Sequence, residues 1–483
     1  MTKEEVEEEP LSPMARLFQS PGIDNCIVTM IGFKAKINPD IILDELKQNV
    51  SKHPRFCSKL SDDGARWMKT KVNVEDHVFV PDIDLHEINK DGDGFVDDYV
   101  SRLTLSTLEK SRPLWDIHIL NVKTSKAEAV SVMRCHHSLG DGMSLMSLLV
   151  ACTRKTSDLK EFPTIPTIKR REKTMSHRLG NKGWFLLSIN AVYSAVKLIW
   201  NTIVDLLLVL AISFLKDTET PISEGAGFRN NAKRLYHQTV SLDDIKFIKN
   251  AMNMTINDVL LGVTQAALSR YLNQRYGNKD VEAGTTISDL NNLPGRIRIR
   301  AGIMVNLRQE IGIQPVADML AKGSKCRWGN YDSTVFVPFT ISLETNPLVP
   351  LLKAKSIMDR KKHSLCAAMN YSVIEFILNN FGPKVFKRTC SNTTAILSNI
   401  VGPVEEVSLH GNHIAYIALS TYGHSQALSI HFISYAEEMG ITITVDPAVI
   451  PDPHNICDEM EESLKAMKDT LSTKSDRFFG MHG

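Results

Sequence analysis

Apolar and polar positions near the start of the chain alternate in a way that predicts a strand followed by a helix. Residues 26–36 are apolar and rich in β-branched side chains, which is typical of a buried strand. Asn38 and Pro39 then supply a helix N-cap and a proline at the first helical position. We therefore expect a helix that begins here and ends before Pro54.

The most apolar stretch of the chain, residues 184–215, is long enough to cross a membrane, which takes about 20 predominantly apolar residues. Lys197, Asn201 and Asp205 interrupt it at intervals of four, so they lie along one face of a helix. The pattern predicts a membrane-associated helix, either spanning or lying in the interface, whose polar stripe faces protein or headgroups. A long helix packed on the domain surface is the alternative.

The length of 483 residues predicts two domains, because single hydrophobic cores stop growing at roughly 250–300 residues. We expect a mobile N-terminus at residues 1–13 and a first domain at 14–183. The apolar helix at 184–215 and a polar linker at 216–233 follow. A second domain is expected at 234–475.

Charge and cysteine content exclude several classes of protein. The formal net charge is +1, so neither a nucleic-acid partner nor a disordered acidic chain is indicated. The 8 cysteines are dispersed without a C-x-x-C pair, which argues against a zinc ribbon, a thioredoxin-like site and a disulfide scaffold. A reducing environment facing the cytosol fits best, and the acidic N-terminus does not have the pattern of a signal peptide.

Two histidines, His136 and His137, follow a predicted strand at residues 128–135, which forms a hairpin with another strand at 115–120. A glycine-containing turn and a helical pattern come next. Adjacent strand residues point to opposite faces, so both histidines can face one site only if the strand breaks there. With a reference pKa near 6.5, histidine can take a proton from an alcohol at neutral pH and so make its oxygen a better nucleophile.

Structural roles compete with the chemical ones at this turn. His136 is also explained as a histidine packed in a strand. Asp141 either fixes the local geometry, by pairing with a cation or accepting from backbone amides, or is simply the N-cap of the following helix. A His-His-Asp cluster can also bind a metal, but no further ligands gather nearby in the sequence, so no metal is expected.

The sequence at residues 136–142, His-His-Ser-Leu-Gly-Asp-Gly, resembles the HHxxxDG motif of the bifunctional wax ester synthase/diacylglycerol acyltransferase family. Residues 113–115, Pro-Leu-Trp, resemble its PLW motif, and residues 257–258, Asn-Asp, resemble its ND motif. These similarities extend over nearly the whole chain. They include the stretches 10–14 and 53–56, which resemble the plant branch, and 398–403 in the C-terminal region.

The resemblance implies an α/β, two-domain chloramphenicol acetyltransferase-like fold with the active-site tunnel between the domains. His137 would be the general base for attack of an alcohol on the thioester of acyl-CoA, with His136 in a supporting position. Asp141 would hold the turn by pairing with an arginine of the other domain, and Arg308 is the candidate. No bound cofactor is implied, because acyl-CoA is a co-substrate.

Asn257 and Trp115 each have a structural and a functional interpretation. Asn257 either stabilises the developing oxyanion by side-chain donation or only shapes a helix start, since Thr255 and Asp258 resemble a capping box. Trp115 is expected to pack in the core rather than to touch substrate, as its large apolar area favours burial.

The resemblance implies long-chain fatty alcohol and diacylglycerol as acceptors, giving wax esters first and triacylglycerol as a side activity. Membrane lipid is an expected partner, at the endoplasmic reticulum or the plasma membrane, with the catalytic domains in the cytosol. Soluble-alcohol acyltransferases of the same fold are one alternative, but their D-F-G-W-G motif is absent, and Tyr422-Gly423-His424 lies in the comparable region. A lipid-binding protein without turnover is another, against which the intact His137 and Asp141 argue.

Overall fold

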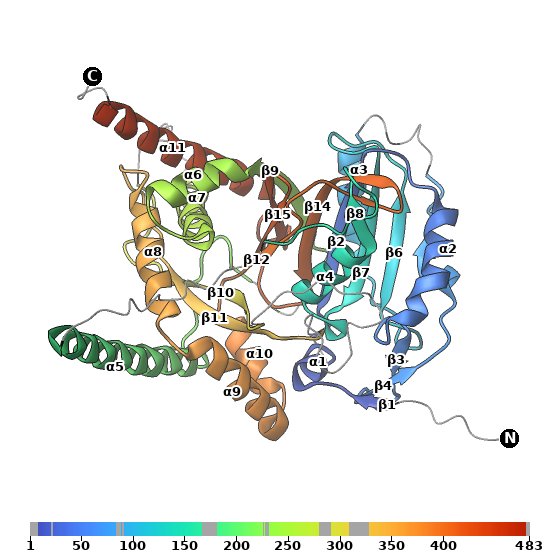
Figure 1. Ribbon diagram of the computed structural model, residues 1–483, viewed down its shortest axis with the longest axis horizontal. Coiled ribbons are helices and arrows are strands. Elements are labelled where there is room, and N and C mark those ends of the chain that lie inside the picture. The colour runs from blue at the N-terminus through green and yellow to red at the C-terminus, as the bar shows by residue number, and fades with distance from the viewer. Residues whose placement is uncertain are drawn as a thin grey trace.

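Two large mixed sheets, each covered by helices, lie side by side in the computed structural model of the protein (Figure 1). The structure describes residues 8–20, 23–83, 88, 91–166, 181–225, 227, 231–279, 291–308 and 328–479. Each sheet has its own hydrophobic core, and the two cores form the two expected domains.

The first sheet has seven strands in the order β5-β6-β7-β2-β14-β13-β8. Helices α2 (Pro39–Asn49) and α4 (Gly142–Cys152) cover one of its faces, and α3 (Gly92–Leu103) packs near the second sheet. The strand and hairpin predictions in this region are confirmed. The strands are β2 (Cys26–Phe33), β5 (Val78–Phe79), β6 (Trp115–Leu120), β7 (Ala129–His136), β8 (Thr153–Lys155), β13 (Val407–Leu409) and β14 (Asn412–Tyr422).

The second sheet has six strands in the order β11-β10-β12-β15-β16-β9, and α7 (Ile256–Lys279) packs between α8 (Val349–Lys362) and α11 (Pro453–Phe479). The sheet includes β9 (Arg234–Ser241), β10 (Ile299–Asn306), β11 (Asp332–Phe339), β12 (Ala395–Val401), β15 (Leu428–Tyr435) and β16 (Glu438–Val445). The remaining described elements are β1 (Glu8–Pro10), α1 (Pro13–Phe18), β3 (Ser58–Leu60), β4 (Arg66–Lys69), α5 (Asn181–Ile212), α6 (Leu242–Ala251), α9 (Cys366–Phe381), α10 (Lys384–Ser391) and three short 3-10 turns.

The second domain is not the contiguous segment 234–475 that was expected. Strand β13 pairs with β8, and β14 pairs with β2, so both belong to the sheet of the first domain. An alternating apolar pattern predicts a strand but does not say which sheet the strand joins. The chain therefore passes from the second sheet into the first after β12 and returns to the second sheet after β14.

Two segments expected to be loosely held are fixed in the described structure. Within residues 1–13, β1 pairs with β4, and Ser12 caps α1 by accepting from the backbone N–H of Ala15 at 3.2 Å. Residues 1–7 lie outside the described part. In the expected linker, the buried carboxylate of Asp217 accepts from Arg300 Nε at 2.6 Å, so the beginning of that segment is anchored to the second domain.

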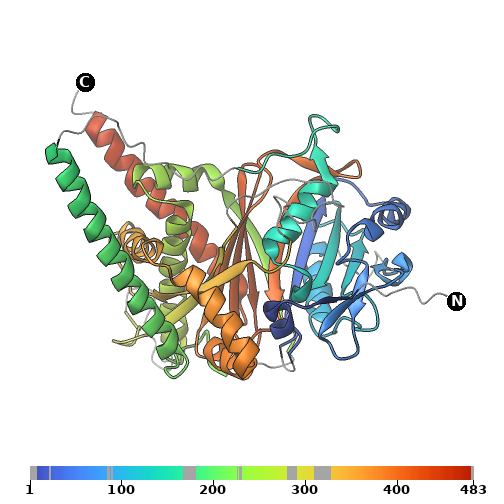
Figure 2. The ribbon, with the colours of Figure 1, turned by 60° about the horizontal axis from the view of Figure 1, so that its bottom comes forward.

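Helix α5 (Asn181–Ile212) corresponds to the apolar stretch, and Asn201 and Asp205 of its polar stripe face the second domain, whereas Lys197 is exposed. The Asn201 amide donates to the His363 carbonyl at 3.0 Å. The fully buried Asp205 carboxylate lies 2.8 Å from Arg360 and 2.7 Å from Lys361. The helix lies along the flank of the molecule (Figure 2), and its large apolar side chains such as Trp200, Ile203 and Leu207 are exposed.

Candidate active site between the two domains

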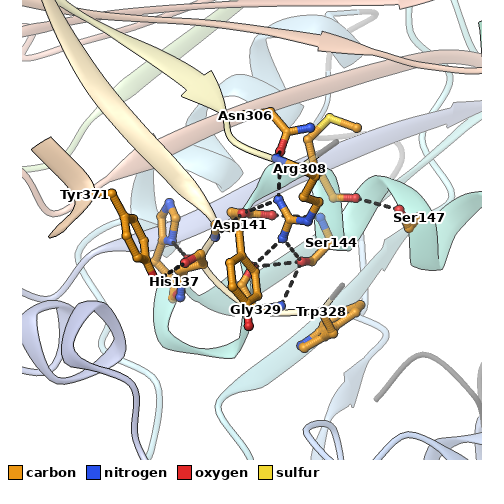
Figure 3. A network of polar contacts seen from close by, with 12 residues as sticks. His137, Asp141, Ser144, Ser147, Asn306, Arg308, Trp328, Gly329 and Tyr371 are labelled. Atoms are coloured by element: carbon orange, nitrogen blue, oxygen red, sulfur yellow. Dashed lines mark hydrogen bonds and ion pairs between the residues drawn. The ribbon is translucent and has the colours of Figure 1, made fainter. Parts of the chain in front are cut away.

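The strand β7 ends at His136, and His137 begins a 3-10 turn over His137–Leu139. Neighbouring residues of a strand already point to opposite faces. The end of the strand at His136 frees the backbone to form the tight turn that carries His137. The backbone N–H of His137 donates to the Asn25 carbonyl at 2.8 Å, which holds the turn against the start of β2. Asp141 then begins α4, and the second domain covers the turn from the other side (Figure 3).

His136 is part of a packed polar network within the first domain. Its Nδ1 accepts from the Ser138 backbone N–H at 3.2 Å and lies 3.0 Å from the Gln19 amide nitrogen. Since Nδ1 accepts, the proton resides on Nε2, which lies 3.5 Å from Asp24 Oδ1. His136 is 1% exposed, and burial lowers its pKa. These contacts give His136 a structural position that joins the residue after α1 to the turn.

The imidazole of His137 is held by Asn330 of the second domain. The Asn330 amide nitrogen donates to the His137 carbonyl at 3.0 Å, so its Oδ1 faces the ring and lies 3.1 Å from Nδ1. An amide oxygen only accepts, and Nδ1 must therefore carry the proton, which leaves the Nε2 lone pair free. Burial lowers the pKa of His137, so the ring is neutral at pH 7, and the Phe18 ring packs 4.3 Å from it.

Asp141 carries both structural roles considered for it. Its Oδ1 accepts from the Ser144 backbone N–H at 2.9 Å, which makes it the N-cap of α4. Its Oδ2 accepts from Arg308 Nη1 at 2.7 Å and from the Tyr331 backbone N–H at 2.9 Å. The side chains of Asp141 and Arg308 are 3% and 5% exposed, so the structure brings the expected ion pair together in a buried position. The carboxylate is fully occupied in holding the turn to the second domain.

The segment 328–331, which precedes β11 and reads Trp-Gly-Asn-Tyr, was not identified from the sequence. Its Trp328 indole donates to the Leu139 carbonyl at 2.7 Å, and its Gly329 carbonyl accepts from Arg308 Nη2 at 2.8 Å. Gly329 has a φ of +125°, a conformation that side-chain-bearing residues rarely adopt. The segment has no helical or strand period, and a glycine beside aromatic residues was the only signal that could have marked it.

Asn257 and Asp258 lie at the start of α7 rather than at the His137 turn. Asp258 accepts from the Thr255 backbone N–H at 2.8 Å and donates its own N–H to Thr255 Oγ1 at 3.3 Å, which is a capping box. Asn257 is exposed, and its Oδ1 accepts from the Asn399 amide at 2.6 Å. This bond joins the 257–258 and 398–403 stretches that the sequence singled out.

Trp115 is a core residue, as expected, with 2% of its surface exposed and its indole donating to the Phe56 carbonyl at 2.9 Å. Among the described residues, no group of three His, Cys, Asp or Glu side chains is arranged to hold a metal ion. Within the described turn, His137 presents a basic atom, its Nε2, that is free to accept a proton.

Comparison with known proteins identifies the family of the chain. Residues 42–260 match the sequence model of the wax ester synthase/diacylglycerol acyltransferase catalytic domain, and residues 328–468 match that of the WS/DGAT C-terminal domain. The chain is 83% identical over 483 residues to wax ester synthase/diacylglycerol acyltransferase 10 of Arabidopsis thaliana, covering 99% of this chain and 100% of that protein. The chain belongs to this family. Its member 7 from the same plant is 62% identical over 471 residues, covering 96% and 98%.

Solved structures with a similar fold include the wax ester synthase/diacylglycerol acyltransferase from Marinobacter aquaeolei VT8. It has a TM-score of 0.59 at 17% identity, with 96% of this chain and 99% of that chain covered. A mutant starter condensation domain of rhizomide synthetase, in complex with C8-CoA and Leu-SNAC, has a TM-score of 0.54 at 12% identity, covering 96% and 94%. The predicted family, acyltransferase class and two-domain fold are thus confirmed.

The bonding at the turn predicts opposite tautomers for the two neighbouring histidines. Nitrogen-15 chemical shifts of histidine-labelled protein at pH 7.5 should show His137 protonated on Nδ1 and His136 protonated on Nε2. In Asn330→Ala the Nδ1 preference of His137 should weaken, while His136 serves as the internal control and keeps its tautomer. A protonated Nε2 on His137 in the wild-type protein would contradict the assignment.

Proposed function

We propose that the protein transfers a long-chain acyl group from acyl-CoA to a fatty alcohol and forms a wax ester, with triacylglycerol formation from diacylglycerol as a side activity. The observation that carries the proposal is the neutral, buried His137, whose Nδ1–H faces Asn330 and whose Nε2 is free to accept a proton. Relatives with 83% and 62% identity are named for both reactions. The C8-CoA complex of a protein with the same fold supports acyl-CoA as co-substrate.

In the proposed reaction, His137 Nε2 takes the proton of the alcohol hydroxyl as that oxygen attacks the thioester carbonyl. The tetrahedral intermediate then expels the CoA sulfur as the C–S bond breaks, and the His137 imidazolium returns the proton to the thiolate. Asp141 and Arg308 take no proton in these steps, since they hold the turn that carries the base. The oxyanion role considered for Asn257 remains a prediction.

Replacement of the base should abolish product formation. We expect His137→Ala to lower turnover of palmitoyl-CoA with hexadecanol by about 10²–10⁴-fold, because the alcohol then attacks without a positioned base. The measurement is wax ester and triacylglycerol formed by purified, detergent-solubilised protein with hexadecanol or dioleoylglycerol. His413→Ala removes an exposed histidine of β14 and should leave both rates unchanged.

Three outcomes of that assay would contradict parts of the proposal. Undiminished product in His137→Ala would refute the base. A folded wild-type protein that makes no ester from either acceptor would refute the long-chain substrates and favour a soluble alcohol or a binding role. A larger rate with dioleoylglycerol than with hexadecanol would reverse the order of the two activities.

The pH dependence should reflect the lowered pKa of His137. The base works only when neutral, and burial stabilises the neutral form, so activity is lost as pH falls through a value below the ordinary 6.5. We expect kcat/KM to fall to half of its plateau at a pH below 6.5 as the buffer is made more acidic. A half-maximal value above pH 6.5 would show that another group, or a more exposed histidine, controls the rate.

We propose further that α5 and α9 bind a lipid membrane along their exposed apolar sides. The segment Asn190–Ile212 is the one candidate span among the described residues by length and composition, and 22% of it is buried. Trp200 and Phe214 at α5, and Phe376 and Phe381 of α9, are each at least 61% exposed. The two helices contact one another and lie on the same side of the molecule (Figures 1 and 2), and each carries exposed apolar side chains that could enter a lipid surface.

A membrane-binding surface on this side would bring the catalytic domains to the lipids in which long-chain alcohols and diacylglycerol dissolve. The buried Asp205 pairs fix the C-terminal half of α5 to the second domain, which favours a helix lying on the membrane with the protein above it. The cytosolic surface of the endoplasmic reticulum is the location that this arrangement and the substrates support, and it remains a prediction.

Removal of two aromatic side chains from this surface should weaken binding to lipid vesicles. Burial of one such side chain contributes about 1.5–3 kcal/mol, so Trp200→Ser with Phe214→Ser should reduce the partition coefficient by at least about tenfold. Vesicle co-sedimentation measures the effect. The matched control, Leu159→Ser with Phe162→Ser, removes exposed apolar side chains of the first domain. Equal loss in both double variants, or none in the first, would contradict the proposed surface.

A further inference from the structure

A cavity of about 210 Å³ lies inside the first domain, between its sheet and the helices α2 and α4. Ile31 and Met133 of the sheet and Ile42 and Leu149 of the helices are representative of its lining, which is mostly hydrocarbon. No function described above uses this space.

The cavity replaces the packing that normally joins a helix to a sheet. Protein interiors are close-packed, and voids larger than a water molecule are few. Yet α2 has no fully buried residue, although Ile42 and Leu46 face the sheet across the cavity. An apolar cavity of this kind does not hold water stably, because water needs two or more polar partners. The space is therefore suited to an apolar ligand.

Strand register gives the direction of the cavity relative to the catalytic turn. Trp115 lies opposite Cys135, the residue before His136, and forms part of the cavity wall nearest the turn. Two residues further from the turn, Thr29 pairs with Met133. Two residues further again, about 7 Å along the strand, Ile31 pairs with Ser131.

The two ends of the cavity differ in character. Leu145 also lines it and lies one helical turn after Asp141, so the near end adjoins the catalytic turn. The far end reaches the exposed residues Cys152 and His410. The apolar lining thus extends from the turn toward the surface.

The near end carries one unpartnered polar side chain, His53, from the 53–56 stretch that the sequence singled out. It is 2% exposed, and neither ring nitrogen has a hydrogen-bond partner within the described part of the structure. Burial lowers its pKa to about 3, so the ring is neutral. It packs 4.2 Å from the Trp328 ring, whose indole donates to Leu139 in the catalytic turn. The hydrocarbon wall therefore ends in a polar group beside the turn.

We propose that this cavity binds the hydrocarbon chain of the acyl group of acyl-CoA, with the terminal methyl toward Cys152 and the thioester end toward His53. The assignment rests on the proposed function. An apolar cavity of about 150 Å³ is known to hold a benzene ring, so about 210 Å³ is enough for a segment of one hydrocarbon chain. Fatty alcohol has one chain and diacylglycerol has two, and acyl-CoA is the substrate common to both reactions. A space with room for a segment of one chain fits that common substrate.

Bulky side chains placed at two depths test the assignment. Ser131→Phe fills the deeper position, and Thr29→Phe fills the position nearer the turn. We expect Ser131→Phe to lower kcat/KM for C16 and C18 acyl-CoA by at least about tenfold relative to C8, with hexanol as fixed acceptor. Thr29→Phe should extend the loss to shorter acyl chains. The control Ile41→Phe adds the same ring beside Ile42 on the exposed side of α2 and should leave the profile unchanged.

The dependence of the rate on alcohol chain length shows whether the cavity binds the acyl chain or the chain of the alcohol. With C8 acyl-CoA fixed, the alcohol profile from C6 to C18 should be the same in Ser131→Phe and wild type. A shortened alcohol profile with an unchanged acyl profile would overturn the assignment to the acyl group, and two unchanged profiles in a variant with wild-type melting temperature would overturn the cavity as a chain site.

A measurement of acyl-CoA binding without turnover tests the chain site separately from the proposed reaction. Calorimetric titration of palmitoyl-CoA and octanoyl-CoA into wild type and Ser131→Phe should show the C16 preference lost in the variant. If the wild type forms no ester but this loss is observed, the proposed reaction fails and the chain site stands. If esters form and the C16 preference persists in Ser131→Phe, the chain site fails and the reaction stands.

Discussion

The ion pair between Asp141 and Arg308 joins the two domains at the turn that carries His137. Both side chains are almost fully buried, and the Asp141 carboxylate also caps α4 and accepts from Tyr331. Desolvation offsets much of the attraction within such a pair, but removal of one partner leaves a buried charge and costs about 3–5 kcal/mol. The ion pair therefore acts chiefly to hold the two domains in one specific arrangement. It fixes the first residues of α4 and the 328–331 segment in one arrangement, and the position of Asn330 against His137 depends on that arrangement.

Besides this ion pair, the domains are connected by a strand and by further buried polar contacts. Strand β14 comes from the C-terminal half of the sequence but completes the sheet of the first domain beside β2. Lys233 donates its backbone N–H to Thr104 of the first domain and pairs in a buried position with Asp446 of the second. The domain contact thus does not rely on the site alone. Tight domain contact buries His137, which favours the neutral form of its imidazole and strengthens its hydrogen bonds.

Much of the first domain and of the turn that carries His137 was predictable because the signals are local. Period-two alternation gave β6 and β7, Asn38 with Pro39 marked the start of α2, and the His-His-x-x-x-Asp-Gly spacing marked the turn. What the sequence could not provide is long-range placement. Nothing local says that β14 joins the first sheet, or that Asn330 lies 193 residues from its partner along the chain and 3.1 Å from it in space. The cavity could not be predicted for the same reason, because in the sequence Ile42 resembles any residue of a packed helix and Ser131 any residue of a packed strand.

The central claim is that the second domain makes His137 a base by holding its ring through Asn330, and a double-mutant cycle tests this most directly. The kcat/KM for palmitoyl-CoA and hexadecanol is measured in wild type, Asn330→Ala, His137→Ala and the double variant, each with a melting temperature as a check on folding. The account predicts that Asn330→Ala lowers kcat/KM substantially when His137 is present and has no further effect when His137 is absent. Equal losses in the two backgrounds would contradict it, because Asn330 would then act independently of the base.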